Sequence, residues 1–428
     1  MTTHAMAASE MVDLDQRRVH RMAYTDPRVF EAEMDRIFRT TWVYVAHECE
    51  LQAPGDYKTT TIGTEPVIVA RADDGQLQVL SNRCRHRGAS VCQARTGNAR
   101  FFRCEYHGWT YRNNGQLVGV TYGEGYGEEL DKNALGLARV PRVESYRGFV
   151  FASFNEQAPP LVDHLAGARE YLDLFIDQAD GSDFEAVHGA QEINYAGNWK
   201  FQLENGCDGY HPNFTHRSFF AMMAGHGDKN SGEYMGSKAP ALARGLGNGH
   251  GVLDQRASSG THYADRVKLS PGAGPLIAAL EEKYTPEELT RHLSNASSVG
   301  FNLTVFPNLQ LIGTHIREII PQAADSTTVR YTPLTIKEHP AELNRLRMRA
   351  HELFYTAAGF GVPDDGEMFL RLEAGLGSQV DWLLLSRGTG REHVTGQVTD
   401  GHITDEVPQR SAWTRWLTLM SADEVLTA

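Results

Sequence analysis

The sequence has little cysteine, no excess of positive charge and no long apolar run. Its 428 residues include five cysteines without the even spacing of a disulfide framework, so a reducing cytoplasm is the expected compartment. A formal net charge of −13 argues against duplex nucleic acid as a partner. The apolar runs are too short for a transmembrane helix, and Met1–Glu10 lacks the charged and apolar regions of a signal peptide, so neither is expected.

Four metal-binding side chains nevertheless form two closely spaced pairs. Cys84 and His86 form a Cys-x-His pair, and Cys104 and His107 form a Cys-x-x-His pair. A Rieske [2Fe–2S] cluster needs two thiolates on one iron and two imidazoles on the other. The same ligand types suit tetrahedral zinc, but zinc fingers usually pair Cys with Cys and His with His. The cluster is therefore the preferred interpretation of these four residues, with zinc as the alternative.

The region around the two pairs is predicted to be β-structure. Short runs rich in Val, Ile, Thr and Tyr extend from Trp42 to about Asn155, with turn signals at residues 73–75 and 113–115. Each metal-binding pair follows a strand-like run, Leu77–Leu80 and Arg100–Arg103. We therefore expect two loops that face each other at the tip of a small antiparallel sheet.

The rest of the chain is predicted to be mixed helix and strand. Thr25-Asp26-Pro27 marks a helix start, because a capping residue precedes Pro in the first turn. Beyond a linker near Glu156, a strand is predicted over Leu309–Ile320 and a helix over Glu342–Ala357. Residues 224–260 are rich in Gly, Ser, Asn and His and are expected to form a mobile excursion. The length allows two domains.

A second candidate metal site lies in this mixed region. His211 and His216 are five residues apart, so on an ideal helix their side chains would point about 140° apart. Both bind one ion only if the helix is widened or broken between them. A non-haem iron(II) oxygenase needs two histidines and a carboxylate on one face of the iron, with positions left open for O₂. Asp364 and Asp365 are candidate carboxylates, and two unrelated core or surface histidines are the alternative.

Together these motifs resemble the large (α) subunit of Rieske non-haem iron aromatic-ring-hydroxylating oxygenases. The resemblance runs from Thr25-Asp-Pro through both cluster pairs and Asn198-Trp-Lys200 to the Asp-Asp pair at 364–365. It implies an α+β fold with three parts. These are an N-terminal helical segment (residues 1–41) packed on the catalytic domain, an all-β Rieske domain (42–156), and a helix-grip-like catalytic domain with a central antiparallel sheet and surrounding helices (157–428).

The resemblance also assigns roles to individual residues. The implied cluster ligands are Cys84, His86, Cys104 and His107, and the implied iron ligands are His211, His216 and Asp365. The register Ala-Gly-x-x-x-x-Asp-Asp-Gly over Ala358–Gly366 favours Asp365 over Asp364. Asp208 corresponds to the family's bridging aspartate, which hydrogen-bonds the iron-ligand histidine and the cluster histidine of a neighbouring subunit. Electrons would therefore cross between subunits of a trimer.

The implied protein is the terminal oxygenase of a multicomponent dioxygenase, which converts an aromatic substrate to a cis-dihydrodiol. Monohydroxylation or demethylation of a related aromatic is the alternative. The sequence has no Rossmann fingerprint, so electrons from NADH must arrive through a separate reductase, with or without a ferredoxin. The chain is most similar to the branch that acts on benzoate, toluate, salicylate or terephthalate. An α3β3 assembly with a small β subunit is expected, with an α3 homotrimer as the alternative.

Candidate substrate contacts follow from this reading. Arg317 lies on a strand that leads toward the expected pocket and is placed to pair with a substrate carboxylate. A structural ion pair with Glu318 or another acid is the alternative. The other candidates, for which an ordinary core role is the alternative, are Asn205, Phe214, Phe219 and Phe220.

Two interpretations of another class compete with the oxygenase. A zinc-binding structural module explains the four residues of the two pairs but leaves the downstream histidines and aspartates without a purpose. A pure Rieske electron carrier explains the cluster but not the whole of residues 157–428.

Overall fold

The computed structural model describes residues 6–127, 129–187, 190–228, 236 and 238–422. It divides into two compact units, one spanning Phe38–Leu161 and the other formed by the described parts of Met1–Ile37 and Val162–Val425. Within these described ranges, no helix is both long and apolar enough to cross a membrane.

The unit Phe38–Leu161 consists of three small antiparallel sheets, in the strand orders β11-β12-β3, β6-β5-β4-β7 and β10-β9-β8. Its elements are β3 (Val43–His47), η2 (Glu48–Glu50), β4 (Asp56–Ile62), β5 (Glu65–Arg71), β6 (Leu77–Ser81), β7 (Thr96–Asn98), β8 (Phe101–Arg103), β9 (Thr110–Arg112), β10 (Leu117–Gly119), η3 (Gly123–Tyr126), β11 (Arg142–Tyr146) and β12 (Phe149–Ser153). The predicted turns join β5 to β6 and β9 to β10, with Gly75 and Gly115 at positive φ. The all-β prediction for this region is confirmed.

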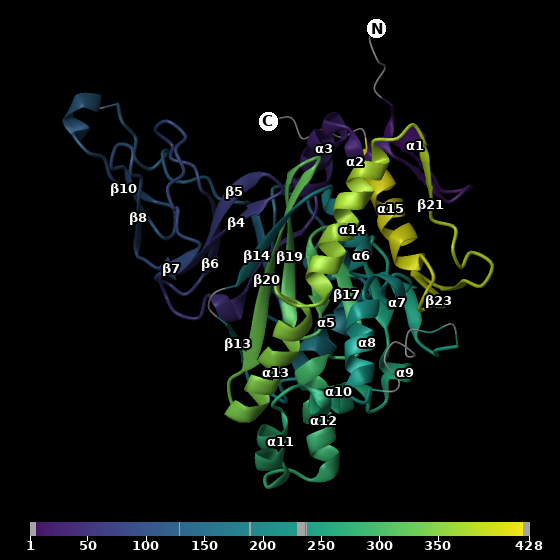
Figure 1. Ribbon diagram of the computed structural model, residues 1–428. Helices are drawn as coiled ribbons and strands as arrows, with labels where there is room; N and C mark the ends of the chain where they lie inside the picture. Colours follow the sequence, from purple (N-terminus) through teal and green to yellow (C-terminus); the bar gives the residue numbers. More distant parts are fainter. Residues whose placement is uncertain (1–5, 128, 188–189, 229–235, 237, 423–428) are drawn as a thin grey trace. The chain divides into compact units, whose positions relative to one another are not determined.

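The second unit is organised around a ten-stranded antiparallel sheet (Figure 1). Nine strands run in the order β13-β20-β19-β18-β17-β16-β15-β23-β22, and β14 also pairs with β20. They are β13 (Phe184–Ala186), β14 (Gln191–Ala196), β15 (Leu242–Gly245), β16 (Gly251–Asp254), β17 (Phe301–Val305), β18 (Leu309–Ile312), β19 (His315–Ala323), β20 (Ser326–Ile336), β22 (His393–Thr395) and β23 (Val398–His402). The first seven residues of β19 are all buried, so both faces of the sheet are covered there.

Helices pack on this sheet and on one another. They are α4 (Leu161–Leu165), α5 (Ala168–Asp177), α6 (Trp199–Asn205), α7 (Pro212–Thr215), α8 (Arg217–Gly225), α9 (Arg256–Ser259), α10 (His262–Leu269), α11 (Gly274–Glu281), α12 (Pro286–Ser297), α13 (Ala341–Phe354), α14 (Gly361–Leu376) and α15 (Val407–Met420). Helix α13 packs on β20, α14 on β14, and α15 on β15 and β16 (Figure 1). The helix-and-antiparallel-sheet architecture predicted for the catalytic domain is confirmed.

The N-terminal segment belongs to the same unit as this sheet. It contains α1 (Ala8–Met11), β1 (Val12–Asp13), β2 (Arg18–His20), α2 (Met22–Thr25), α3 (Pro27–Glu33) and the π-helical turn η1 (Met34–Phe38), and β2 pairs with β21 (Trp382–Leu384). Asp26 caps α3 as its sequence predicts, accepting a hydrogen bond from Arg28 N at 2.9 Å. Glu33, at the end of α3, accepts hydrogen bonds from Lys200 Nζ and from the indoles of Trp199 and Trp416. Buried polar contacts therefore fasten this segment to α6 and α15.

Two predictions about secondary structure are wrong in detail. In the expected excursion over residues 224–260, of which 229–235 and 237 lie outside the described residues, β15 and β16 form a hairpin within the large sheet. Their flanking partners β17 and β23 supply the backbone hydrogen bonds, so tertiary pairing overrides the low strand propensity of the glycines. The single strand predicted over Leu309–Ile320 is two strands, β18 and β19, that reverse at Gly313.

Candidate metal centres

The two cysteine–histidine pairs lie on two loops of the same design. After β6, the amide of Gly88 donates to the carbonyl of Cys84 at 2.9 Å; after β8, the amide of Gly108 donates to the carbonyl of Cys104 at the same distance. Both glycines have positive φ, 79° and 72°, which a side chain would strain. Two matching loops are therefore present, but they follow strands of two different sheets and do not share the tip of a single sheet as expected.

The sulfurs and the imidazoles of these loops lie in different environments. Cys84 and Cys104 are buried in the apolar core of the unit, whereas the rings of His86 and His107 are only half-buried, with centroids 4.5 Å apart. The Tyr111 hydroxyl lies 3.2 Å from Cys84 Sγ. Two buried thiolates and two more exposed imidazoles suit a Rieske cluster, in which the cysteines bind one iron and the histidines the other. A hydrogen bond to a sulfur is one of the features that set the potential of such a cluster.

The spacing of the donors separates the cluster from a single zinc ion. Zinc holds four donors at about 2.0–2.3 Å and so draws them all close together. Among the described residues, two groups of three or more His, Cys, Asp or Glu have ligand atoms within 4.8 Å of one another, and neither contains a residue of the two Cys–His pairs. The donors of these pairs are therefore not gathered around one point, which favours a cluster of two irons over a single zinc ion.

A break between two helices places the downstream histidines. Helix α7 begins with Pro212 directly after His211, and His216 stands between α7 and α8 with φ −96° and ψ 24°. The helix is thus interrupted, as the five-residue spacing requires if both rings are to face one point. Asp365 is delivered by the first turns of α14.

His211, His216 and Asp365 form one of the two close groups of potential metal ligands. Nε2 of His216 lies 3.3 Å and Nε2 of His211 lies 3.7 Å from the same oxygen, Oδ1 of Asp365. Although burial opposes it, His216, His211 and Arg317 hold the pKa of Asp365 below its usual value. Two imidazoles and one ionised carboxylate that converge from one side match the facial donor set of non-haem iron(II).

Three further side chains orient this group. Oδ2 of Asp208 lies 3.3 Å from Nδ1 of His211, and Oδ2 of Asp364 lies 3.5 Å from Nδ1 of His216. The amide of Asn205 donates to Asp365 Oδ1 at 3.1 Å and also approaches Nε2 of His211. Carboxylates behind ligand histidines fix the ring orientation and tautomer. The positions of Asp208 and Asp365 agree with the sequence register, and Asp364 takes an outer position.

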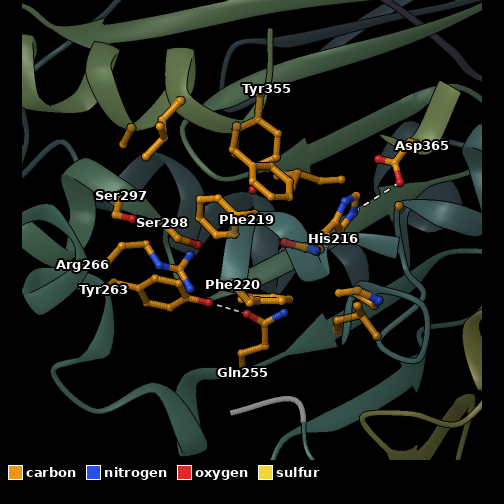
Figure 2. Close-up of a pocket in the computed structure, with 18 of the residues that line it drawn as sticks. His216, Phe219, Phe220, Gln255, Tyr263, Arg266, Ser297, Ser298, Tyr355 and Asp365 are labelled. Carbon is orange, nitrogen blue, oxygen red and sulfur yellow. Dashed lines mark hydrogen bonds and ion pairs between the residues drawn. The ribbon is translucent and has the colours of Figure 1, made fainter. Parts of the chain in front are cut away.

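A cavity opens from the histidine–carboxylate group (Figure 2). His216 and Asp365 lie at one side of it, and Arg266, Tyr263 and Gln255 lie at the other. Arg317, Asn205, Phe219 and Phe220 also line it, as the sequence predicts. Phe214 does not: its side chain is 69% exposed, because α7 turns this face outward. Tyr263, Gln255 and Arg266 escaped the sequence analysis, since they lie on α10 and before α9 without any motif.

The chain resembles known proteins along most of its length. The model of the Rieske [2Fe-2S] domain matches residues 41–127, and the model of the ring hydroxylating alpha subunit (catalytic domain) matches residues 183–397. The chain is 34% identical over 390 residues to the 2-halobenzoate 1,2-dioxygenase large subunit of Burkholderia cepacia, covering 87% of this chain and 80% of that protein. It is 33% identical over 371 residues to the toluate 1,2-dioxygenase subunit alpha of Pseudomonas putida, covering 84% and 79%.

Further similarities agree with these. The anthranilate 1,2-dioxygenase large subunit of Acinetobacter baylyi is 33% identical over 391 residues, covering 87% of this chain and 80% of that protein. Among solved structures, naphthalene 1,2-dioxygenase with indole bound in its active site superposes with a TM-score of 0.81 at 28% identity, covering 97% of this chain and 95% of that one. Sequence and fold therefore agree over both units.

Proposed function

Since the chain belongs to the family of ring-hydroxylating oxygenase α subunits with a Rieske [2Fe–2S] domain, we propose that it hydroxylates an aromatic acid whose carboxylate pairs with Arg317. The family makes the protein an oxygenase that binds a Rieske cluster and a mononuclear iron and uses NADH through a reductase. The residue assignments, the substrate class and the assembly are our proposals.

We assign the cluster to Cys84, His86, Cys104 and His107 and the iron to His211, His216 and Asp365. The supporting observations are the matched loops and the convergence of three donors on one point. When bound, the cluster stores one electron and the iron offers open positions to O₂. The protein's own residues fix the ligand rings, through Asp208 and Asp364, and enclose the substrate.

The setting of Arg317 is the observation that carries the substrate proposal. Its side chain is 3% exposed, yet it lines the cavity beside the proposed iron ligands. Within the described residues its one hydrogen bond runs from Nε to Nε2 of His315, at 2.9 Å, and its guanidinium has no carboxylate within ion-pair distance. A buried guanidinium without a hydrogen-bonded carboxylate is costly, and a substrate carboxylate would supply that partner.

The rival partner of Arg317 is occupied elsewhere. Adjacent residues of a strand point to opposite faces, so Glu318 turns away from Arg317 and pairs with Arg330 of β20 at 2.9 Å. The Arg317 guanidinium instead lies over the rings of Tyr331 and Tyr355, 5.0 and 5.2 Å from their centroids. These rings hold the guanidinium in place without neutralising it.

The apolar side chains suit the ring of such a substrate. Phe219 and Phe354 contact each other edge to face at 4.8 Å beside His216, and Phe220 completes this wall. An aromatic ring held here would lie close to the iron ligands and away from water. The halobenzoate, toluate and anthranilate named for the relatives are all aromatic carboxylates, which supports the same substrate class for this chain.

Turnover of paired substrates by an Arg317→Gln variant tests the proposal. We expect kcat/KM for a benzoate-type acid to fall at least about 30-fold, the loss of a buried charged partner, while a neutral arene of equal size is unaffected. The assay follows substrate-dependent O₂ and NADH consumption with a reductase, and product mass separates a dihydrodiol from a monohydroxylated product. Equal loss with both substrates, or none with the acid, contradicts the role of Arg317.

The assembly that we propose is α3β3, in keeping with relatives described as large subunits. In it, Asp208 would accept hydrogen bonds from His211 and from His107 of a neighbouring subunit and so connect cluster to iron. We further assign residues 42–156 to the cluster domain, residues 157–428 to the iron domain and residues 1–41 to a segment packed on the latter. A cytoplasmic location accords with five cysteines that are all unpaired.

A further inference from the structure

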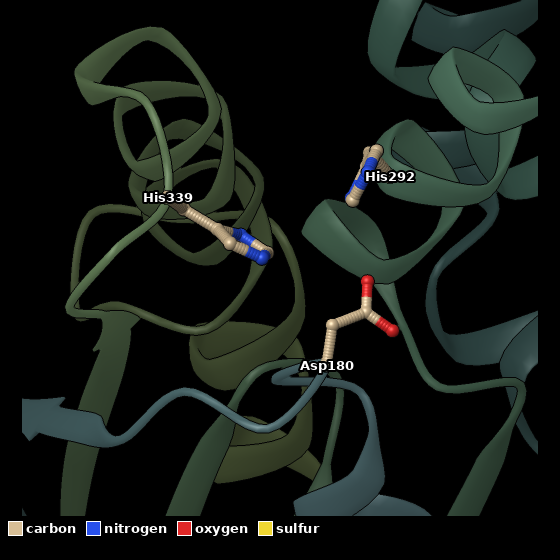
Figure 3. A group of neighbouring side chains, drawn as sticks. All are labelled: Asp180, His292 and His339. Carbon is tan, nitrogen blue, oxygen red and sulfur yellow. The ribbon is translucent and has the colours of Figure 1, made fainter.

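A second group of two histidines and one carboxylate lies outside the proposed iron site. Asp180 stands in the turn after α5, His292 in the middle of α12, and His339 in the turn between β20 and α13 (Figure 3). Their potential ligand atoms all lie within 4.8 Å of one another. Figure 3 shows both rings and the carboxylate converging on one gap. From this geometry we propose a divalent transition-metal site, most suited to Zn²⁺.

The state of His292 supports a ligand at this position. Its side chain is 8% exposed, and its Nδ1 has no hydrogen-bond partner among the described residues. A buried imidazole nitrogen without a partner loses the hydrogen bond that water would give it, and a metal ion would replace that bond. The ring of His339 lies edge to face with it at 5.4 Å, so a second imidazole is at hand.

The two imidazoles bind a metal ion in their uncharged form, which offers a lone pair on a ring nitrogen. Two nitrogens and one carboxylate oxygen form a borderline donor set that suits Zn²⁺, with water as the fourth ligand.

Arg291 is the competitor for this site. Its Nη1 contacts both oxygens of Asp180, at 2.7 and 2.6 Å, so the carboxylate is neutralised by an arginine. The Arg291 side chain is 50% exposed and can turn into solvent when a metal ion replaces it. The three ligands must then close from at most 4.8 Å to about 3.4 Å, the donor separation of a tetrahedral site with bonds of about 2.1 Å.

The position of α12 gives the site a consequence for the cavity. The helix carries His292 at its centre and ends at Ser297, which lines the substrate cavity together with Ser298. A metal ion that joins α12 to the turns at Asp180 and His339 would fix the helix that forms this wall. The metal ion would therefore act on the position of α12 and not through the proposed iron ligands.

Zinc titration of the enzyme with its iron and cluster in place tests the proposal. We expect one zinc per chain beyond the iron by elemental analysis, with the iron content unchanged. His292→Ala and His339→Ala should each weaken zinc binding at least about tenfold. His393→Ala, an exposed histidine of the same unit, should bind as the wild type does. Zinc bound equally by all three variants, or no zinc beyond the iron site, overturns the proposal.

Arg291→Ala should change the zinc affinity in the opposite direction, which distinguishes loss of a ligand from misfolding. Removing the competing arginine should tighten zinc binding about tenfold or more, a gain that damage to the fold cannot produce. Asp180→Asn, at a side chain that is 42% exposed, should weaken it. An Arg291→Ala variant with wild-type or weaker zinc affinity contradicts the geometry proposed here. The mononuclear iron content, measured on the same samples, confirms in each case that the unit that carries the substitutions keeps its fold.

Discussion

The carboxylate of Asp208 lies 3.3 Å from Nδ1 of His211, while Nε2 of the same ring faces Asp365 at 3.7 Å. The two carboxylates therefore hold the imidazole from opposite sides. Although burial opposes it, Asp208 and Asp365 raise the pKa of His211 above its usual value. Oδ1 of Asp208 also accepts a hydrogen bond from the backbone amide of Tyr210 at 2.6 Å. This aspartate therefore fixes the backbone of the loop as well as the orientation of the His211 ring.

Asp208→Asn should leave both metals bound and slow electron transfer from the cluster to the iron. Asparagine keeps an oxygen for the backbone amides but removes the charge that joins the two histidines in our proposal. We expect the cluster of the reduced enzyme to reoxidise at least about tenfold more slowly in a single turnover with substrate and O₂. Cluster absorption and iron content, measured on the same sample, should match the wild type.

Asp364→Asn is the matched control for this experiment. Asp364 also lies behind a histidine that we assign to the iron, 3.5 Å from Nδ1 of His216, but it is not part of the proposed path between the metals. Its single-turnover rate should stay near that of the wild type. If cluster reoxidation were slowed equally in Asp208→Asn and Asp364→Asn, Asp208 would only orient its histidine and would not carry electrons between the metals.

Removing one partner of the buried pair Glu33–Lys200 should strongly destabilise the fold. Glu33 is fully buried and accepts hydrogen bonds from Lys200 Nζ at 2.5 Å and from two indoles. Glu33→Gln leaves the Lys200 ammonium buried without a counter-charge, which costs about 3–5 kcal/mol of unfolding free energy. A urea unfolding series followed by tryptophan fluorescence measures the change.

The exposed pair Glu367–Arg371 provides the control for this comparison. It has a similar separation, 2.9 Å, but both side chains are more than half exposed. Glu367→Gln should lower the unfolding free energy by less than about 1 kcal/mol. If Glu33→Gln were equally mild, Glu33 would not be what fastens the N-terminal segment to α6.

Glu204 should make stability depend on pH. Burial raises its pKa from 4.5 to about 7, against hydrogen bonds from Tyr24 and Trp413. The folded protein then holds a proton that the unfolded chain releases, so this group's contribution to stability is full below pH 4.5 and is lost as pH rises toward 7. Glu204→Gln removes this loss, so between pH 5 and pH 8 the unfolding free energy of the variant should rise by roughly 2.5 kcal/mol relative to that of the wild type. Parallel profiles for the two proteins would contradict a raised pKa.

Local sequence was sufficient to predict the two loops that carry the Cys–His pairs, and it predicted a break between His211 and His216 on the condition that both bind one ion. Cys84 and His86 are close in the chain, and the positive φ of Gly88 fits its place after them. The five-residue spacing of His211 and His216 implied an interrupted helix. These features depend on residues that are close together in the sequence, so the spacing of the residues is enough to predict them.

Features that depend on distant strands could not be predicted in this way. The glycine-rich hairpin of β15 and β16 is strand only because β17 and β23 flank it. Whether Arg317 or Arg330 pairs with Glu318 depends on the register between β19 and β20. The same applies to Phe214, since helical periodicity alone does not say which face of α7 the neighbouring elements cover.

The oxidation of substrate by a His211→Ala variant tests the assignment of two metal centres most directly. The variant should keep the absorption spectrum of the cluster and its reduction by the reductase, because His211 and the four proposed cluster ligands belong to different compact units. It should lose most of its mononuclear iron and form no hydroxylated product. Wild-type product formation with the cluster intact would contradict the account, because the iron would then lie elsewhere.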